Sequence, residues 1–217
     1  MTFVQTPALA LLPRVFDRLA GTAPDLQVEV IQSETAPVLD DPRARAVDLV
    51  VGIEYDPVPV PRQHDVDRRD LMREEVLLAL HPEHPAAPKR GPIRLAACEH
   101  VAWASGHRGT GLDAVVRNVC NRLGGFEPDI RHRSDDGLVL SALVASGRAI
   151  ALLPALLTAA VPQITTRRLR EERLGRTMFT ATRTTTAEAP AVLAVRQALH
   201  DTAQQVAVGQ RDLEVVS

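Results

Sequence analysis

Short apolar runs with a strand-like pattern alternate along this chain with longer runs that have helical periodicity. Residues 48–53 (Asp-Leu-Val-Val-Gly-Ile) are almost entirely apolar, as expected of a strand that is buried on both faces. Residues 112–123, by contrast, carry their apolar side chains at the spacing of one helical face. This alternation predicts parallel sheets covered by helices on both faces, which is an α/β fold.

The strand and helix patterns form two similar blocks within the 217 residues. Six strands are expected, three in each block, at residues 28–31, 48–53, 75–81, 100–104, 130–133 and 149–153. A strand at 177–182 and an apolar-faced helix from Val192 to Val206 follow the second block. Two such blocks predict two lobes that face a cleft, where ligands bind beyond the carboxyl ends of the strands.

Glycine, aspartate and proline mark several expected element ends. Gly124-Gly125 is expected to end the helix that follows Gly111, because glycine accepts the left-handed conformation of a helix C-terminus. Asp135 or Asp136 is expected to cap the next helix, and the preference of helix N-termini for acidic residues explains this pair better than a paired-carboxylate site does. Pro154 is expected to stop the strand at 149–153.

The chain begins on a very short strand pattern, Met1–Val4. Thr6-Pro7 follows at once and opens an apolar helical run that contains Leu9, Leu12, Val15, Phe16 and Leu19. Threonine before proline is a favourable helix start, so Thr6 is expected to be the N-cap. A complete α/β domain usually has a full first strand, and we therefore expect that a longer chain precedes Met1.

Composition narrows the class of protein. The net charge of −2 provides no basic surface for nucleic acid. Cys98 and Cys120 lack zinc-site spacing and are expected to be two buried thiols in a reducing cytosol. The longest apolar stretch, residues 149–160, is too short to span a bilayer, and no signal peptide pattern is present. We expect a cytoplasmic protein that does not contact a membrane.

Six short stretches occur in an order and with a spacing that are typical of one protein family. They are residues 11–13 (Leu-Leu-Pro), 47–49 (Val-Asp-Leu), 81–85 (His-Pro-Glu-His-Pro), 125–128 (Gly-Phe-Glu-Pro), 143–147 (Leu-Val-Ala-Ser-Gly) and 150–154 (Ile-Ala-Leu-Leu-Pro). With them the chain resembles, over nearly its whole length, the effector-binding domain of LysR-type transcriptional regulators. It departs from that family at Pro42 and Arg45, which stand where leucine and glycine are usual.

This resemblance implies a periplasmic-binding-protein-like fold, with two Rossmann-like lobes of mostly parallel sheets around a central cleft. Lobe one would comprise residues 1–76 and 163–217, and lobe two residues 77–162. The implied function is to bind a small-molecule effector in the cleft. The candidate donors, which are Thr6, Thr35 and the amides of residues 105–111, favour an anionic or carbonyl-bearing molecule, and no cofactor or metal ion is expected. The implied partners are further copies of the chain, as a homodimer or homotetramer, and promoter DNA through an N-terminal helix-turn-helix domain that lies outside this sequence.

Two other functions are weighed against the regulator. A stand-alone solute-binding protein of a transporter would have the same fold, but the missing signal peptide argues against it. An enzyme is not expected, because the sequence contains no Gly-x-Ser-x-Gly elbow and no dinucleotide-binding fingerprint.

Three polar residues of the first lobe are candidate ligand contacts by resemblance to the family. Thr6 occupies a position where the family commonly places a ligand-binding serine or threonine, and helix N-termini attract anions. Ser33 and Thr35 follow a predicted strand and would approach the effector from the cleft edge. The alternative for Thr6 is a simple helix cap, and for Ser33 and Thr35 a cap or a solvated turn.

The segment Ser105-Gly-His-Arg-Gly-Thr110-Gly joins a predicted strand to a helix in the second lobe. Its glycines let backbone amides approach a ligand, and Ser105, His107 and Thr110 offer side-chain hydrogen bonds. Arg108 is suited to pair with a carboxylate. The alternative is a flexible, solvated turn with an exposed arginine.

The remaining candidates are apolar or aromatic, apart from one histidine pair. Trp103 is either a core residue or an aromatic surface for the ligand, and the resemblance adds Leu153 and Pro154 to the ligand site. His81 and His84 have the look of a metal pair, but Pro82 and Pro85 keep them off a common helix face. No metal site is therefore expected.

Overall fold

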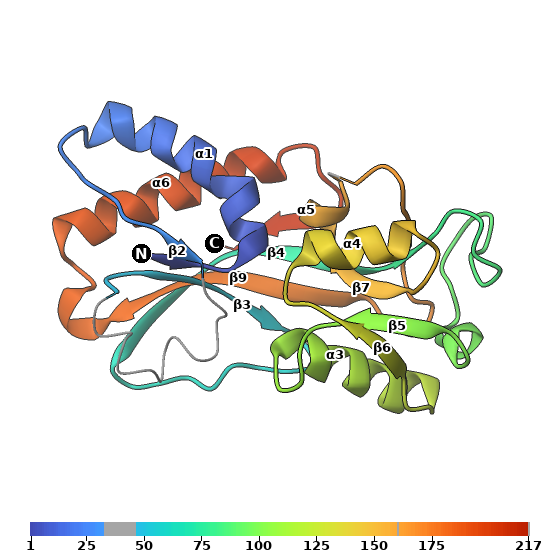
Figure 1. Cartoon of the computed structure of the whole chain (residues 1–217). Coiled ribbons are helices and arrows are strands. Elements are labelled where there is room, and N and C mark those ends of the chain that lie inside the picture. Colours follow the sequence, from blue (N-terminus) through green and yellow to red (C-terminus); the bar gives the residue numbers. More distant parts are fainter. Residues whose placement is uncertain (33–46, 160, 217) are drawn as a thin grey trace. The chain divides into compact units, whose positions relative to one another are not determined.

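The computed structural model describes residues 1–32, 47–159 and 161–216 (Figure 1). Within these ranges the chain divides into two compact units, each built from separate stretches of sequence. Unit 1 contains Met1–Glu54, Val60–Arg73 and Thr177–Ser217, and unit 2 contains Tyr55–Pro59 and Glu74–Arg176. The lobe boundaries expected from the sequence stay a prediction. Ser33, Thr35 and the helix expected between residues 35 and 46 lie outside the described residues.

Unit 1 is organised around a sheet whose strands come from both ends of its sequence. In spatial order these strands are β10 (Leu213–Val215), β4 (Val66–Leu80), β9 (Leu174–Arg183), β3 (Val50–Tyr55), β1 (Thr2–Phe3) and β2 (Ile31–Gln32). The short β1 pairs in parallel with two neighbours, so that Thr2 lies opposite both Ile31 and Val50. Of the strand expected at residues 28–31, only Ile31 lies in a strand, which continues to Gln32.

Helices α1 (Gln5–Thr22) and α6 (Pro190–Ala207) lie side by side against this sheet (Figure 1). An ion pair of 3.3 Å between Arg18 and Asp201 links them. The buried face of α1 carries Leu11, Val15 and Leu19. Leu9 and Phe16 were expected on that face but remain 55% and 41% exposed. The helix is buried through the side that carries Leu11, and Leu9 and Phe16 lie outside it.

Unit 2 combines a parallel strand pair with antiparallel strands. Strand β5 (Ala102–Ser105) pairs in parallel with β6 (Asp129–Arg133), and a parallel bridge joins Trp103 to Ile150. The second half of β4 pairs in antiparallel fashion with β7 (Ala151–Pro154) and β8 (Thr165–Arg167). Helices α3 (Gly111–Val119, extended by a π-helical turn, Cys120–Gly124), α4 (Gly137–Ala145) and α5 (Ala155–Thr158) accompany these strands. The predicted α/β fold is confirmed.

Local sequence signals explain several element ends. Gly125 ends the helical segment at a φ of +74°, which only glycine adopts without strain. Asp136 caps α4, since its carboxylate accepts hydrogen bonds from the amides of Leu138 at 2.8 Å and Val139 at 3.3 Å. Both predictions are confirmed, and Asp136 is identified as the capping member of the acidic pair.

Three element ends differ from the prediction. Helix α1 begins at Gln5, one residue before the expected cap, so Thr6 lies inside its first turn and the Val4 N-cap makes no side-chain cap bond. Pro154 is the last residue of β7 and does not stop the strand ahead of itself, since α5 begins directly afterwards. Strand β4 begins at Val66, well before the start expected at residue 75. The prediction missed its first half because the charged side chains there form ion pairs within the fold and give no apolar pattern.

The two cysteines are free and buried, as predicted. Burial, assisted by the charge of Glu171, raises the pKa of Cys98 to about 11. Burial also raises the pKa of Cys120 to about 12, with a further contribution from Cys98. Both side chains are therefore protonated thiols at neutral pH, which are poor nucleophiles.

A buried ion pair lies within unit 2, at the positions where the chain passes between units. Arg176 is 3% exposed and Glu74 is 1% exposed. The Nε of Arg176 donates to Oε1 of Glu74 at 2.7 Å, and the Tyr55 hydroxyl lies 3.4 Å from Nη1 of Arg176. The other oxygen of Glu74 accepts a 3.0 Å hydrogen bond from the amide of Leu156 in α5.

Replacing either member of this pair is expected to destabilise the fold strongly. Glu74→Leu or Arg176→Met leaves one charge buried without its partner, which costs about 3–5 kcal/mol, whereas the double variant removes both charges and costs less than the sum. Urea unfolding of the single and double variants measures the coupling. Arg131→Ala, in an exposed pair with Asp129, is the control and should change little. Strictly additive single and double variants would contradict the coupling.

Candidate functional site

The loop between β5 and α3, residues 106–110, lies at the carboxyl end of its strand. Strand β6 ends beside it, since the amide of Ser134 donates to the carbonyl of Ser105 at 3.0 Å. Because β5 and β6 are parallel, their carboxyl ends share one edge of the sheet. Ligands of open α/β sheets bind at such an edge, so this loop is the candidate binding site of unit 2.

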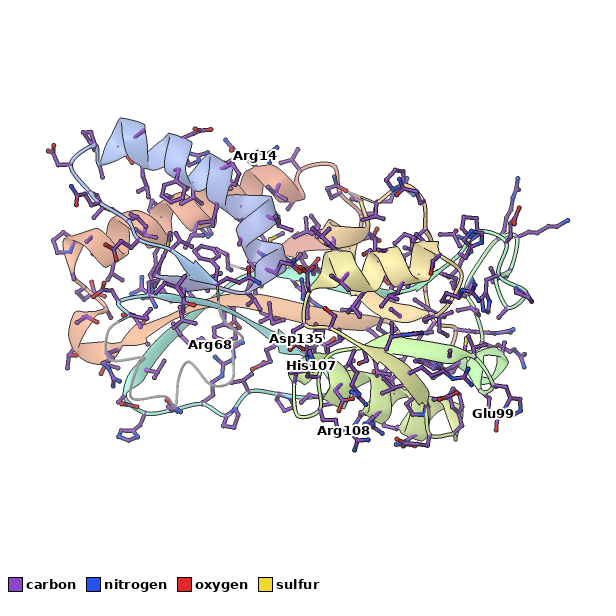
Figure 2. All side chains as sticks on the ribbon, in the orientation of Figure 1. Arg14, Arg68, Glu99, His107, Arg108 and Asp135 are labelled. Carbon is purple, nitrogen blue, oxygen red and sulfur yellow. The ribbon has the colours of Figure 1, made fainter. Side chains whose placement is uncertain are left out.

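Side chains that follow β6 hold this loop in place. Nη1 of Arg133 donates to the carbonyl of Gly106 at 2.8 Å. The two oxygens of Asp135 hold His107, one by a 2.9 Å bond from its amide and the other by a 2.7 Å contact with its Nδ1 (Figure 2). The hydroxyl of Thr110 donates to the carbonyl of His107 at 2.9 Å. Side-chain hydrogen bonds therefore hold the loop, while Arg108 is exposed, as the alternative of a solvated turn also expected.

Asp113 connects the same network to the first turn of α3. Its carboxylate is buried and accepts from Arg133 at 2.7 Å and from Arg117 at 3.4 Å. Burial opposes ionisation of Asp113, but the hydrogen bond from Arg133 and the charges of Arg117 and Arg133 outweigh it and lower its pKa. The carboxylate therefore stays charged and fixes the loop at neutral pH.

The held loop exposes hydrogen-bond donors and one charged side chain. The first amides of a helix have no acceptor within the helix, and the Thr110 side chain makes no cap bond to those of α3. With Nδ1 engaged by Asp135, His107 has its Nε2 left for a ligand, and its side chain is 63% exposed. Arg108 is also exposed. The arrangement suits an anion or a carbonyl oxygen.

Glycine is required at one position of this loop. A Cβ at Gly106 would lie 2.3 Å from the hydroxyl of Thr110 and 3.1 Å from a carboxylate oxygen of Asp135. The adjacent Ser105 is fully buried, and its hydroxyl has no hydrogen-bond partner among the described residues. The site thus combines close backbone packing with an unsatisfied hydroxyl at its base.

Four residues that contribute to this region were missed from the sequence. Arg133 and Asp135 hold the loop, Arg176 is part of the buried pair, and the ring of Tyr55 lies 3.4 Å from a Cβ built on Gly111. Asp135 was interpreted only as a helix-end charge beside the Asp136 cap, and the structure adds its contacts with the amide and ring of His107. No short motif marks these residues, since they lie far from the loop in sequence.

The other predicted ligand residues lie in different surroundings. Trp103 is fully buried and donates its indole N–H to the carbonyl of Cys98 at 3.4 Å, which supports the core alternative. Leu153 belongs to a buried cluster with Ala104 and Leu140. Pro154 is buried at the end of β7, and Thr6 is buried in the first turn of α1 in unit 1. Ligand contact by any of these residues stays a prediction.

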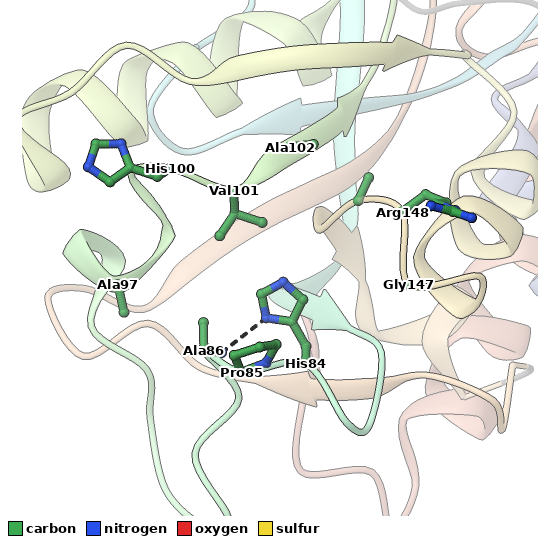
Figure 3. Close-up of a pocket in the computed structure, with 10 residues that line it drawn as sticks. His84, Pro85, Ala86, Ala97, His100, Val101, Ala102, Gly147 and Arg148 are labelled. Atoms are coloured by element: carbon green, nitrogen blue, oxygen red, sulfur yellow. Dashed lines mark hydrogen bonds between the residues drawn. The ribbon is translucent and has the colours of Figure 1, made fainter.

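A cavity of about 580 Å³ opens at the opposite edge of unit 2 (Figure 3). Its walls include Ala97, His100 and Val101, which precede β5, and residues 147–149, which precede β7, so it lies at the amino ends of these strands. Nδ1 of His84 accepts a 3.1 Å bond from the amide of Ala86, and burial and the nearby His81 lower the pKa of His84. Nδ1 of His81 accepts from the amide of Glu83, so backbone donors occupy one nitrogen of each ring.

The described part of the chain has neither a metal-ligating cluster nor a membrane-spanning helix. Residues 1–32, 47–159 and 161–216 contain no group of three or more histidine, cysteine, aspartate or glutamate side chains placed to hold a metal ion. No helix in the same ranges has the length and apolar character needed to cross a bilayer.

Residues 1–204 match the family model described as the LysR substrate binding domain. The chain belongs to this family. The resemblance seen in the short sequence stretches is therefore confirmed, and with it the periplasmic-binding-protein-like fold class.

Solved structures of LysR-family regulatory domains share this fold. The effector-binding domain of QuiR in complex with shikimate has a TM-score of 0.77 at 16% identity, and the match covers 94% of this chain and 95% of that one. The CcmR regulatory domain of Synechocystis PCC6803 in complex with 2-PG also has a TM-score of 0.77, at 17% identity and 92% and 94% coverage. A Corynebacterium glutamicum OxyR C206 mutant matches at 0.75 and 19% identity over 95% of this chain, which spans 64% of that OxyR chain.

Asp113→Asn is expected to destabilise unit 2 by about 1–2 kcal/mol at neutral pH, because hydrogen bonds to a charged group are lost. The folded pKa of Asp113 lies below its ordinary value of 3.8, so its stabilisation is present above that pH and is lost as the pH falls through the folded pKa. Chemical unfolding between pH 2 and pH 7 should therefore show the variant and the parent converging in acid. Asp129→Asn, an exposed neighbour, is the control, and a difference independent of pH would contradict the assignment.

Proposed function

We propose that this chain is an effector-sensing domain that binds a small anionic molecule at the 105–111 loop. The observation that carries the proposal is the pinning of this loop by Arg133 and Asp135, which gathers its donors at the carboxyl edge of β5 and β6. A binding site whose donors are already ordered loses less conformational entropy when a ligand arrives. Membership in the LysR substrate binding domain family supports the regulatory role.

Each residue of the loop has a distinct part in this proposal. The α3 amides donate to ligand oxygens, Arg108 contributes a positive charge, and the ring of His107 offers Nε2 for a further hydrogen bond. Asp135 is a positioning residue, because it orients His107 through Nδ1 without itself contacting the ligand. Thr6 in unit 1 and Thr35, beyond the described residues, remain further predicted contacts. The small molecules named for QuiR and CcmR show that domains of this fold bind such ligands.

Regulation would follow from a difference in effector affinity between two arrangements of the domain. In the proposal, this change passes to a DNA-binding domain N-terminal to this chain, in a cytoplasmic regulator. The full-length CbnR structure, solved with its target DNA, provides the precedent, and the match covers 69% of that chain. Signalling by cysteine oxidation is not part of the proposal, because Cys98 and Cys120 are buried with raised pKa values.

The test is a thermal-shift screen of small carboxylates and phosphate esters, with shikimate and inorganic phosphate included, followed by titration of each hit. We expect hits whose affinity falls about tenfold in His107→Ala and in Asp135→Asn, because the ligand's hydrogen bond with the His107 ring is lost or misdirected. Arg131→Ala, exposed on β6, is the matched control and should keep full affinity. Hits that bind the His107 and Asp135 variants as tightly as the parent would contradict the proposed site.

Self-association is a further part of the proposed function, with unit 1 as the contact surface. Leu9 and Phe16 on α1 and Ile31 on β2 are exposed apolar residues. Among the described strands β2 ends the spatial order of the sheet, and such edges pair readily with another chain. Exposed apolar residues beside a sheet edge support contact with a second copy of this chain.

Phe16→Glu is expected to shift the chain from an oligomer toward the monomer, because it places a charge in an apolar contact. Size-exclusion chromatography with light scattering at several concentrations measures the change. Leu138→Glu is the control, since Leu138 is an exposed apolar residue on α4 in unit 2. An oligomer unaffected by Phe16→Glu would place the contact elsewhere.

A further inference from the structure

Arg68 in β4 is a buried arginine in unit 1 with an incomplete set of partners (Figure 2). Its side chain is 7% exposed, and its guanidinium carbon lies 3.8 Å from the centre of the Phe179 ring. Nε donates to Asp70 at 2.8 Å and Nη1 donates to Glu54 at 2.5 Å. The guanidinium is thus fixed in position by a ring beneath it and two carboxylates at its edge.

The third nitrogen, Nη2, is buried but has no hydrogen-bond partner among the described residues. A buried donor without an acceptor costs free energy comparable to a lost hydrogen bond, and a charged donor costs more. Glu54 and Asp70 each engage a different nitrogen, which leaves the two hydrogens of Nη2 available. This unsatisfied donor is an independent indication that an acceptor belongs here.

The side chain of Arg68 forms part of the wall of a cavity of about 170 Å³. Among the described residues, its wall has two charged members, and both are arginines: Arg68 and Arg62. Glu54 and Asp70 are not part of the wall. The other wall residues are mainly apolar: Val60, Pro61, Gln63, Val66, Phe179 and Ala181. The described part of the wall therefore presents positive charge and apolar surface, and it includes no carboxylate.

We propose that this cavity binds a short aliphatic monocarboxylate, with its carboxylate on Nη2 of Arg68 and on Arg62 and its alkyl chain against the apolar wall. Guanidinium and carboxylate form charge-assisted, geometrically matched hydrogen bonds. The volume equals that of about five or six liquid waters, which limits the ligand to a few carbon atoms. The face of Phe179 under the guanidinium is already occupied, so a flat aromatic acid has no ring to stack on.

The expected affinity is millimolar. Glu54 and Asp70 offset part of the charge of Arg68, and Arg62 lies 3.8 Å from Asp70. The site lies wholly within unit 1, whereas the 105–111 loop belongs to unit 2. The inference is therefore independent of the proposed effector site.

The test is an NMR titration of the 217-residue chain with butyrate, with butyramide as the neutral analogue of the same shape. We expect saturable amide shifts at Val66, Phe179 and Ala181 with butyrate below about 50 mM, and affinity at least about tenfold weaker for butyramide. Equal binding of the two compounds, or the absence of saturable shifts at these residues, would overturn the proposal.

Variants then locate the bound carboxylate. Arg68→Lys and Arg62→Gln should each weaken butyrate about tenfold, and Val66→Phe should fill the cavity and abolish binding. Should Arg68→Lys fail to fold, Arg62→Gln and Val66→Phe still decide the outcome. Arg14→Gln, an exposed arginine on α1, is the matched control and should bind butyrate normally.

Asp135→Asn separates this site from the proposed effector site. It should leave butyrate binding unchanged, because Asp135 lies in unit 2. Loss of butyrate binding in Asp135→Asn with retention in Arg62→Gln would place butyrate at the loop and overturn the Arg68 site, while the proposed function would stand. If Asp135→Asn loses effector binding but keeps butyrate binding, the Arg68 site stands.

Discussion

The rest of the structure depends on the buried ion pair between Glu74 and Arg176, which are the first and last residues of the main stretch of unit 2. Both units are assembled from separate stretches of sequence, and strands β4 and β9 contribute residues to each of them. Glu74, Arg176 and Tyr55 are the unit 2 residues at three of the points where the chain changes units. Their mutual contacts, and the bond from Glu74 to the first turn of α5, tie these segments together inside unit 2.

Burial gives this pair its importance, because two charges inside a protein are tolerated only when each satisfies the other. The same physics operates at the candidate site on a smaller scale. Asp113 is buried between Arg133 and Arg117, and Arg133 in turn holds the carbonyl of Gly106. Charged side chains thus hold the backbone of the loop that is proposed to bind the effector.

Arg68 differs from these arginines in its surroundings. Nη2 of Arg176 also lacks a hydrogen bond, but it lies 2.6 Å from Oε1 of Glu74 in the ion pair. Nη2 of Arg68 has neither a hydrogen bond nor an ion-pair partner among the described residues, and Arg68 lines a cavity. A group of this kind carries a cost that a bound acceptor would remove. The two proposed ligand sites therefore rest on different observations: ordered donors at a sheet edge in unit 2, and an unsatisfied donor in unit 1.

Much of the fold was predictable because its causes are local. The apolar strand at β3, the left-handed Gly125, the Asp136 cap and the helical face of α3 follow from side-chain chemistry over a few residues. The charged half of β4 was missed because its side chains find partners far away in sequence, so no apolar alternation marks the strand. The N-cap of α1 was placed two positions too late, at Thr6 instead of Val4, because the helix begins before the favourable threonine-proline pair.

The sequence by itself determined the α/β class, the family, and the loop between β5 and α3 as a candidate site, since each follows from patterns or motifs in short stretches of chain. Only the tertiary structure decided that Asp135 binds His107, that Trp103 lies in the core, and that Glu74 and Arg176 pair. Hydrogen bonds and ion pairs depend on distances of a few ångströms. Residues separated by tens of positions reach such distances only after the strands have taken their places in the sheet.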